Sequence, residues 1–203
     1  MPGCTASWPT AHATIMAELF YVIGASGAGK DSILNYARLN IRSEMAVAFA
    51  HRYITRPADA GGENHIALSE EEFSNRAQMG CFALQWYSHN KWYGIGVEIN
   101  QWLAMGLHVV VNGSRAYLDV ALRNYPNMIP VLVSVAPQKL RDRLVARGRE
   151  ERDEIEARVV QATALERTIQ HPRLAKIDND GVLADAGECL IKLIHDRNKC
   201  VCS

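Results

Sequence analysis

The chain has 203 residues, of which 48% are hydrophobic and 22% charged, so it holds enough apolar material for one compact core and is short for several large domains. Its 22 Lys and Arg residues equal its 22 Asp and Glu residues, and the formal net charge is zero. A neutral chain has no overall field that would gather DNA or RNA, so we expect no nucleic-acid partner and a local site for any anion that binds.

Cysteine use and the termini indicate a cytoplasmic protein. Five scattered cysteines are too few for a disulfide scaffold and indicate a reducing compartment. Cys200 and Cys202 have the spacing of a metal clip or a redox pair, but they lack partner ligands, which favours a flexible tail over residues 198–203. No apolar run reaches the ~18 residues of a membrane span, so no membrane partner is expected. The first Lys or Arg is Lys30, too late for a targeting presequence, so residues 1–17 are predicted to be a disordered extension.

Short apolar strands alternate with amphipathic helices along most of the chain. Residues 19–23 form an apolar run that Gly24 ends, which is typical of a strand buried on both faces, and a helical pattern follows through Ile33, Leu34 and Ala37. Further strands are predicted at 47–49, 108–111, 129–135 and 174–177, and further helices at 155–169 and, behind a cap at Asp180, at 183–193. This alternation predicts an α/β protein with a parallel sheet, in one domain over residues 18–197.

Residues 52–96 interrupt this alternation. The segment is rich in Gly, Asn, Glu and aromatic residues and shows little periodicity. We interpret it as an inserted lobe, over about residues 50–97, that binds the acceptor substrate.

The turn after the first strand has the composition of a phosphate-binding P-loop. It reads Gly24, Ala25, Ser26, Gly27, Ala28, Gly29 and Lys30. Glycines let backbone N–H groups surround phosphate oxygens, the helix N-terminus adds a positive dipole, and the lysine binds the terminal phosphates. A plain glycine-rich turn is the less favoured alternative. The predicted fold is therefore a P-loop NTPase with a three-layer parallel-sheet core, and the predicted ligand is ATP.

The position after the lysine departs from the usual pattern. Ser or Thr normally stands there and its hydroxyl binds Mg²⁺, whereas this chain has Asp31, with Ser32 one place later. The strand at 108–111 is followed by Asn112, where a P-loop kinase often has a metal-supporting Asp. We therefore predict that Asp31 and Ser32 serve Mg²⁺, with Asp31 acting directly or through water. The alternative is that Asp31 is only a favourable acid in the first turn of its helix.

Arginines are concentrated between residues 140 and 158. They are Arg141, Arg143, Arg147, Arg149, Arg152 and Arg158. Arg143 and Arg147 share a helix face and Gly148 supplies a hinge, which indicates a helical lid that closes over the ATP phosphates. Arg147 and Arg158 are the preferred lid pair and join Lys30 and Asp31 as predicted catalytic residues. The interleaved acids leave a solvated, salt-bridged helix as the alternative.

The inserted lobe carries motifs in an order that resembles a known superfamily. They are Thr55-Arg56, Gly62-Glu63, Glu72-Phe73, Gly80-Cys81-Phe82 and Tyr93-Gly94. Together with the P-loop, this order resembles the guanylate kinase superfamily over most of residues 19–195. More specific tracts resemble the ribose 1,5-bisphosphate phosphokinase family of phosphonate catabolism. They are Gly-Lys-Asp-Ser at 29–32, Arg-Tyr-Ile-Thr-Arg-Pro at 52–57 and Glu-Asn-His at 63–65.

The resemblance implies transfer of the ATP γ-phosphate to the 5-phosphate of ribose 1,5-bisphosphate, giving 5-phosphoribosyl 1-diphosphate and ADP. Guanylate kinases read guanine with a Glu after Gly-x-Phe and an Asp beyond the next strand. This chain has Gln85 and the tract Asn112-Gly113-Ser114-Arg115 at those places. A guanine pocket thus loses its carboxylates, and the charge of Arg115 suits an acceptor phosphate instead.

Further acceptor residues follow from the motif positions and from charge. Two phosphomonoesters call for separate bidentate donors, and Arg52 and Arg56 are the first such cluster. Tyr93 matches the family's phosphate-contacting Tyr, and Glu63 belongs to the same motifs. His65 is either a donor to the phosphate or sugar, or a residue with a structural hydrogen bond.

Some assignments stay open at this point. Asn179 is predicted to touch adenine, with a turn or cap role as an equal alternative, and His89 and His108 are interpreted as structural. A nucleoside monophosphate kinase and a non-catalytic guanylate kinase-like binding module are the alternative functions, and the intact Gly29-Lys30 argues against the module. The sequence contains no feature that indicates an oligomeric state, and a homodimer is one candidate.

Overall fold

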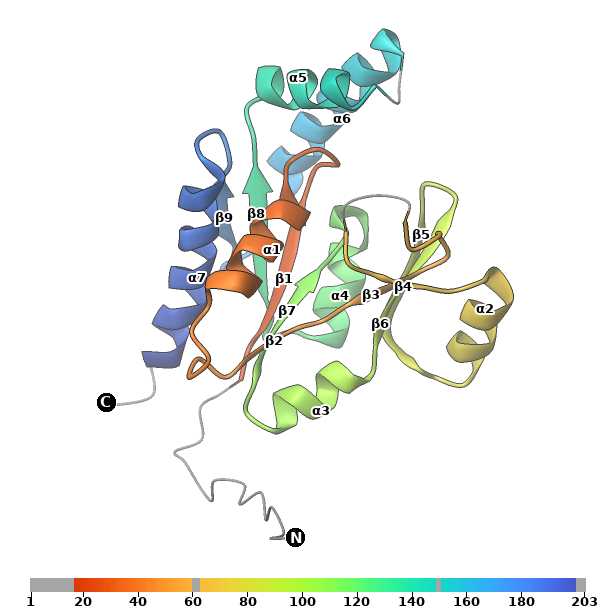
Figure 1. Cartoon of the computed structure of the whole chain (residues 1–203), viewed down its shortest axis with the longest axis vertical. Coiled ribbons are helices and arrows are strands. Elements are labelled where there is room, and N and C mark those ends of the chain that lie inside the picture. The colour runs from red at the N-terminus through yellow and green to blue at the C-terminus, as the bar shows by residue number, and fades with distance from the viewer. Residues whose placement is uncertain (1–16, 60–62, 149–150, 200–203) are drawn as a thin grey trace, which may run out of the picture.

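The computed structural model describes residues 17–59, 63–148 and 151–199 (Figure 1). Residues 1–16 of the predicted extension, and the pair Cys200 and Cys202, lie outside the described residues. Helix α7 (Leu183–Lys199) continues past residue 198, which corrects the predicted start of the tail. No helix in the described part of the chain is long and apolar enough to cross a membrane.

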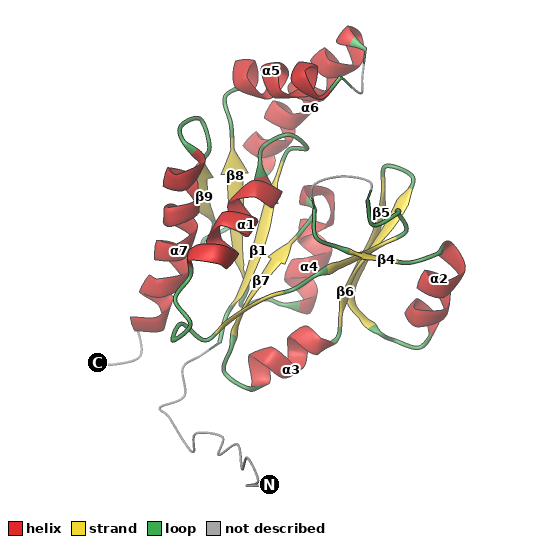
Figure 2. Ribbon diagram, in the orientation of Figure 1, coloured by secondary structure: helices red, strands yellow, loops and turns green. Residues whose placement is uncertain are grey.

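Five parallel strands form the central sheet, in the order β2-β7-β1-β8-β9 (Figure 2). They are β1 (Leu19–Gly24), β2 (Val47–Phe49), β7 (His108–Asn112), β8 (Ile129–Ser134) and β9 (Ala175–Asp178). Strand β1 lies in the middle and every one of its residues is buried, as expected for a strand covered on both faces. The predicted α/β class with a parallel sheet is confirmed.

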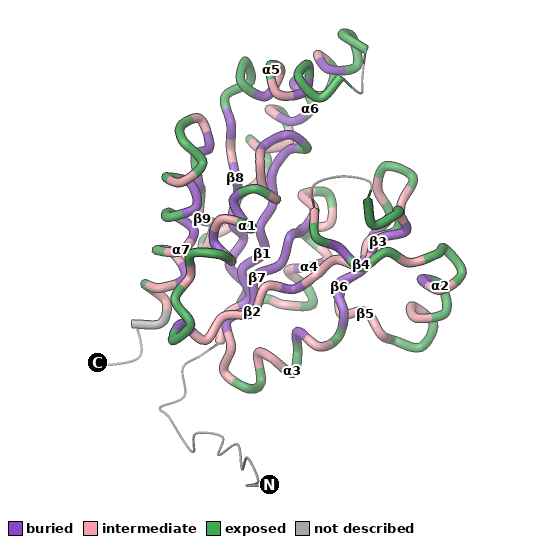
Figure 3. Tube along the Cα trace, viewed as in Figure 1, coloured by how far each residue is buried: buried purple, intermediate pink, exposed green. Residues whose placement is uncertain are grey.

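Alternate residues of β1 face two different hydrophobic cores. The core helices besides α7 are α1 (Lys30–Asn40), α3 (Glu98–Ala104) and α4 (Leu118–Asn124). Phe20 and Val22 pack in the core that holds residues of α1 and α7, whereas Tyr21 and Ile23 pack in the core that holds residues of α3 and α4. Figure 3 shows the buried strands between helices whose outer faces are exposed. Because side chains of a strand alternate between faces, the apolar run of β1 supports helices on both sides, and the core has three layers.

A second, four-stranded sheet comes entirely from the segment predicted to be the inserted lobe. Its strands are β3 (Arg52–Ile54), β4 (Ile66–Ala67), β5 (Phe82–Ser88) and β6 (Lys91–Gly96), in the order β4-β3-β6-β5. Strand β6 pairs antiparallel with β3 and β5. Helix α2 (Glu70–Gln78) packs on this sheet through Phe73, whose ring stacks on Phe82 with 4.5 Å between centroids. Figure 1 shows this sheet beside the central one, on the side of β7.

Helices α5 (Pro137–Arg147) and α6 (Arg152–Thr168) form the region predicted to be the lid. Pro137 stands in the first turn of α5, and Gly148 ends the helix in a left-handed conformation at φ 61°. The two helices lie across one end of the central sheet (Figure 1). Asp180 does not cap α7, since its Oδ1 accepts a hydrogen bond from the Ala136 amide at 2.8 Å, which corrects that prediction.

Candidate active site

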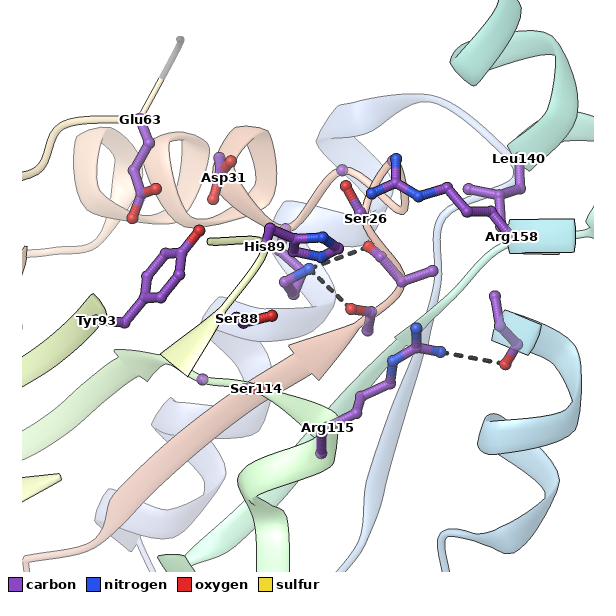
Figure 4. A pocket seen from close by; sticks show the side chains of 18 of the residues that line it. Ser26, Asp31, Glu63, Ser88, His89, Tyr93, Ser114, Arg115, Leu140 and Arg158 are labelled. Atoms are coloured by element: carbon purple, nitrogen blue, oxygen red, sulfur yellow. Dashed lines mark hydrogen bonds between the residues drawn. The ribbon is translucent and has the colours of Figure 1, made fainter. Parts of the chain in front are cut away.

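A cleft of about 570 Å³ lies where the P-loop, the second sheet and the lid helices meet (Figure 4). P-loop residues Gly24 to Gly27 and Gly29 to Ser32 line one wall, and residues of β5, β6 and α6 line others. The carboxyl ends of parallel strands β1 and β7 meet at this edge of the sheet, so the loops that follow them share the cleft. A cleft of this size is typical of small-molecule sites.

The P-loop backbone needs glycine at two positions. Gly27 and Gly29 have φ of 97° and 90°, a region that side-chain-bearing residues rarely adopt. A Cβ at Gly27 would also approach a Leu140 methyl group to 2.9 Å. Lid helix α5 therefore packs directly on the loop that is predicted to hold phosphate.

Lys30 is the first residue of α1 and directs its amine back into the loop. Its Nζ donates hydrogen bonds to the carbonyl oxygens of Gly24 at 2.9 Å and Ala25 at 3.0 Å. Burial lowers the pKa of the Lys30 ammonium to about 8, and the neighbouring Asp31 carboxylate opposes that shift. A buried ammonium group at a helix N-terminus binds a polyphosphate strongly, because the phosphate charge stabilises the ammonium in place of the water that burial excluded.

The Asp31 side chain contacts Asn112, the last residue of β7. The Asn112 amide Nδ2 donates to Asp31 Oδ1 at 2.6 Å, and Arg52 Nη2 lies 3.8 Å from the same oxygen. The carbonyl Oδ1 of Asn112 is buried and has no hydrogen-bond partner among the described residues. The described residues contain no cluster of three or more His, Cys, Asp or Glu that would hold a metal by themselves. The oxygens of Asp31 and Ser32 still fit Mg²⁺, since that ion usually takes one or two protein oxygens and completes its shell with phosphates and waters.

Arginines of the inserted lobe form a compact ion-pair cluster on Glu63. Arg52 donates from Nε and Nη2 to the two carboxylate oxygens of Glu63, and Arg56 Nη2 lies 3.4 Å from the same group. The side chains of Arg52 and Glu63 are only 13% and 10% exposed, so this pairing is largely desolvated. The Arg52 guanidinium also lies over the Tyr93 ring, 5.3 Å from its centroid. One carboxylate thus fixes two guanidinium groups that face the cleft.

A third guanidinium enters the cleft from the end of β7. Arg115 begins the short 3-10 helix η1 (Arg115–Tyr117) and donates from Nη1 to the Ala162 carbonyl of α6 at 3.1 Å (Figure 4). Its Nη1 lies 3.7 Å from Glu166. Burial lowers the pKa of Arg115 and raises the pKa of Glu166, while their mutual attraction opposes both shifts. The residue predicted to serve an acceptor phosphate is therefore tied to the lid helix.

The lid arginines have three kinds of surroundings. Arg147 and Arg158 line the cleft, whereas Arg141 pairs with Glu156 on an outer face. Arg143, which the sequence suggested only as a lid residue, donates to the carbonyls of Asn179 at 2.8 Å and Ala28 at 3.3 Å. It braces α5 against the P-loop and the loop after β9. Its position on the same helix face as the buried Leu140 was the available signal for this inward role.

Several predicted site residues have other surroundings in the structure. Gln85 is exposed and lines a separate depression with Phe73 and Trp92, because β5 alternates and turns Trp86 and Ser88 toward the cleft instead. This corrects the expected place of Gln85. His65 is buried, with Nε2 3.2 Å from the Arg56 carbonyl and Nδ1 3.1 Å from the Glu63 carbonyl. That placement corresponds to the structural alternative for His65.

Asn179 supports the P-loop from behind through the loop residue Ala28. The Asn179 side chain is buried, and its Nδ2 donates to the Ala28 carbonyl at 2.6 Å. Neither residue is among those that line the cleft, and the contact of Asn179 with adenine stays a prediction. A buried amide at this position holds the Ala28 carbonyl of the glycine-rich loop in place.

Residues that the sequence analysis did not predict to bind a ligand also line the cleft. They include Ser88, His89, Ser114 and Gln161. His89 and Asn90 form the turn between β5 and β6, with φ of 48° and 56°, and the prediction that His89 is structural is corrected because its ring points into the cleft (Figure 4). His108 is structural as expected, since it is buried and its Nδ1 accepts from the Glu18 amide at 3.0 Å. A non-glycine hairpin turn was the sequence signal for His89.

Comparisons with known proteins identify the family. No protein-family model matches the chain. The chain is 54% identical over 179 residues to "Ribose 1,5-bisphosphate phosphokinase PhnN" of Desulfomicrobium baculatum, covering 88% of this chain and 95% of that protein. The chain belongs to the ribose 1,5-bisphosphate phosphokinase PhnN family. PhnN proteins of Burkholderia pseudomallei, at 53% identity over 178 residues, and Thiobacillus denitrificans, at 52% over 183 residues, cover 88% and 89% of this chain and 95% and 94% of their own.

A solved structure supports the PhnN fold independently. Guanylate kinase from Anaplasma phagocytophilum matches with a TM-score of 0.65 over 91% of this chain and 87% of its own, at 11% identity. This likeness shows the fold alone. The resemblance to the phosphokinase family drawn from residues 29–32, 52–57 and 63–65, and the guanylate kinase-like fold, are confirmed.

Proposed function

We propose that the chain is an ATP-dependent kinase that converts ribose 1,5-bisphosphate to 5-phosphoribosyl 1-diphosphate, with ADP as the second product. The observation that carries the proposal is a P-loop lysine that shares one cleft with arginines of the inserted lobe, in a chain of the PhnN family. We also propose a cytoplasmic location, because ATP is the donor and the few scattered cysteines indicate a reducing compartment.

Atom balance corrects the expected acceptor group. The product carries its diphosphate on C1, so the accepting group is the 1-phosphate and not the 5-phosphate. An oxygen of the 1-phosphate attacks the γ-phosphorus of ATP, the bond from that phosphorus to the β,γ-bridging oxygen breaks, and its electron pair leaves with ADP. The acceptor needs no general base, because the second ionisation of a phosphomonoester lies near ~6. The chain's task is to align two polyanions and to offset their repulsion.

The donor half of the site consists of the P-loop and the lid. Lys30 and the loop amides bind the β- and γ-phosphates, and Asp31 with Ser32 would hold Mg²⁺, which neutralises phosphate charge when bound. Arg147 and Arg158 extend from α5 and α6 into the same cleft. Their guanidinium groups offset charge on the transferred phosphoryl group and help the lid to exclude water.

The acceptor half consists of three guanidinium groups with different supports. Arg52 and Arg56 share Glu63, and Arg115 is fixed to α6. Two separate phosphates on one sugar match these two separate clusters. Glu63 accepts hydrogen bonds and repels phosphate, so it orients the two arginines and suits a ribose hydroxyl rather than a phosphate oxygen.

The test is a product assay with purified protein, ATP and Mg²⁺. Phosphorus-31 NMR would follow the acceptors ribose 1,5-bisphosphate, ribose 5-phosphate and GMP in parallel. We expect a new diphosphate signal and stoichiometric ADP with ribose 1,5-bisphosphate alone. Turnover with GMP in preference to the bisphosphate would establish the nucleoside monophosphate kinase instead, and no turnover with any acceptor would overturn the kinase assignment.

A further inference from the structure

Asp31 and Asn112 form a hydrogen-bonded pair between two elements of the P-loop core. Asp31 lies in the first turn of α1, and Asn112 is the last residue of β7, 81 positions later in the chain. The amide Nδ2 of Asn112 donates to Asp31 Oδ1 at 2.6 Å. The Asn112 residue is 5% exposed, whereas the Asp31 side chain is 46% exposed and lines the cleft. A buried amide thus holds a cleft-facing carboxylate.

Asp31 and Asn112 differ in which of their oxygen atoms can still bind a ligand. A carboxylate accepts several hydrogen bonds or metal contacts, so Asp31 keeps one oxygen available after Asn112 has engaged the other. The Oδ1 of Asn112 is buried and lacks a partner among the described residues. An unpaired buried acceptor is unfavourable, so Asn112 is kept at a position where its own side chain is not fully satisfied. A buried acceptor without a partner, next to a cleft-facing carboxylate, therefore requires an explanation other than packing.

P-loop proteins generally hold Mg²⁺ with a neutral hydroxyl after the lysine and an acidic residue at the end of a neighbouring strand. In this chain the two chemical types are exchanged: the acid follows Lys30 and the neutral amide ends β7. The positions are still in contact, as the 2.6 Å hydrogen bond shows. The contact between the two positions is therefore kept, and the negative charge lies on Asp31 of α1 instead of at the end of β7.

We propose that Asn112 is a positioning residue that holds Asp31 for the Mg²⁺ of bound nucleotide, and that the two residues form a metal-supporting pair of reversed polarity. The inference rests on the proposed function only in requiring a Mg²⁺-nucleotide, and it is independent of the acceptor. Arg52, whose Nη2 is 3.8 Å from Asp31 Oδ1, then links the metal-facing carboxylate to the acceptor cluster on Glu63.

The experiment measures ADP binding by titration calorimetry, with and without Mg²⁺, in the full-length protein. The readout is the factor by which Mg²⁺ tightens ADP binding, and no turnover is needed. Asn112→Leu keeps the number and branching of the side-chain heavy atoms and removes the donor. We expect it to lower the Mg²⁺ factor by about 10-fold or more, as loss of an outer-shell partner commonly does, and to leave metal-free ADP affinity within about twofold. Asp119→Asn, which removes an exposed acid on α4, is the charge-matched control for Asp31→Asn.

The exchanged variant provides the second arm and guards against a folding defect in Asn112→Leu. Asp31→Asn alone should lose the Mg²⁺ factor, and Asp31→Asn combined with Asn112→Asp should recover most of it, because the pair keeps one amide and one carboxylate in contact. The proposal fails if Asn112→Leu, folded as judged by its melting temperature, keeps the wild-type Mg²⁺ factor. It also fails if the exchanged variant is no better than Asp31→Asn. A wild-type Mg²⁺ factor without turnover of ribose 1,5-bisphosphate would overturn the proposed acceptor and leave this pair standing.

Discussion

Lys30 illustrates how one residue carries both a stability cost and a binding function. Its pKa of about 8 lies below the ordinary value of 10.5 because burial disfavours the ammonium. In the ligand-free protein this burial therefore costs stability below about pH 8, and the cost is relieved as the pH rises from 8 toward 10.5. A bound polyphosphate reverses the preference, since it stabilises the charged amine.

This reversal predicts pH-dependent nucleotide binding. ADP should bind about tenfold more weakly at pH 9 than at pH 7, because the deprotonated Lys30 must take up a proton on binding. Calorimetry in buffers of different ionisation enthalpy would detect that proton uptake. Lys30→Arg keeps its charge across this range and should flatten the profile. An equally steep profile in Lys30→Arg would assign the effect to another group.

Arg52 tests the role of planar, bidentate recognition in the lobe. Lysine cannot reproduce its two bonds to Glu63 or its stacking on Tyr93. We expect Arg52→Lys to raise KM for ribose 1,5-bisphosphate by about 10- to 100-fold, with a smaller change in KM for ATP. Arg76→Lys is the matched control, because Arg76 pairs with Glu72 on α2 in the same lobe. Equal changes in both KM values would argue against an acceptor role.

At the scale of elements, the P-loop depends on neighbours that are distant in sequence. Asn179, after β9, and Arg143, on α5, both donate to the Ala28 carbonyl. Gly29 can approach Asn179 closely only because it has no Cβ. The loop conformation is thus set by β9 and α5 as much as by its own glycines.

Removing the Arg143 brace should destabilise the protein and weaken nucleotide binding together. Arg143→Ala leaves the Asn179 carbonyl without its guanidinium donor, and the loss of hydrogen bonds from a charged group costs about 1–3 kcal/mol. Urea unfolding would measure the stability change, and calorimetry the ADP affinity. Arg141 lies on the same helix as Arg143 and makes a partly exposed ion pair with Glu156 of α6. Arg141→Ala breaks that pair and should change stability and ADP affinity only slightly. If the two variants behaved alike, the brace would have no special role.

At the scale of the molecule, zero net charge conceals a concentrated positive cleft. Among the described residues, six cations line the cavity: Lys30, Arg52, Arg56, Arg115, Arg147 and Arg158. The acidic residues of the same described set that line it are Asp31 and Glu63. The cleft also joins the central sheet, the lobe and the lid, so ligands that occupy it should hold three parts of the fold together.

This geometry predicts additive or greater stabilisation by the two substrates. ADP with Mg²⁺ and ribose 1,5-bisphosphate should each raise the melting temperature, since a ligand at about 100 times its Kd contributes about 2.7 kcal/mol. Both together should give at least the sum, because each neutralises repulsion between the cations that face the other. A combined shift no larger than about the larger single shift would mean that the two ligands compete for one subsite.

Local patterns in the chain were sufficient for much of the fold and for the charged half of the site. The apolar runs at 19–23 and 129–135, the glycine spacing before Lys30 and the composition of 52–96 are features of neighbouring residues, and the α/β class and family followed from them. Long-range geometry decided the remainder. For example, Ser88 lies on the face of β5 that lines the cleft, whereas Gln85 lines a separate depression.

The amino-acid sequence by itself determined which cations and acids are present and the order of elements that carries them. Only the tertiary structure decided their partners: Asp31 with Asn112, Arg143 with the P-loop, and Arg115 with α6. The physical reason is that hydrogen bonds and burial depend on which strand ends and helix faces meet. Residues far apart in the chain meet only once the parallel sheet has brought the carboxyl ends of its strands to one edge.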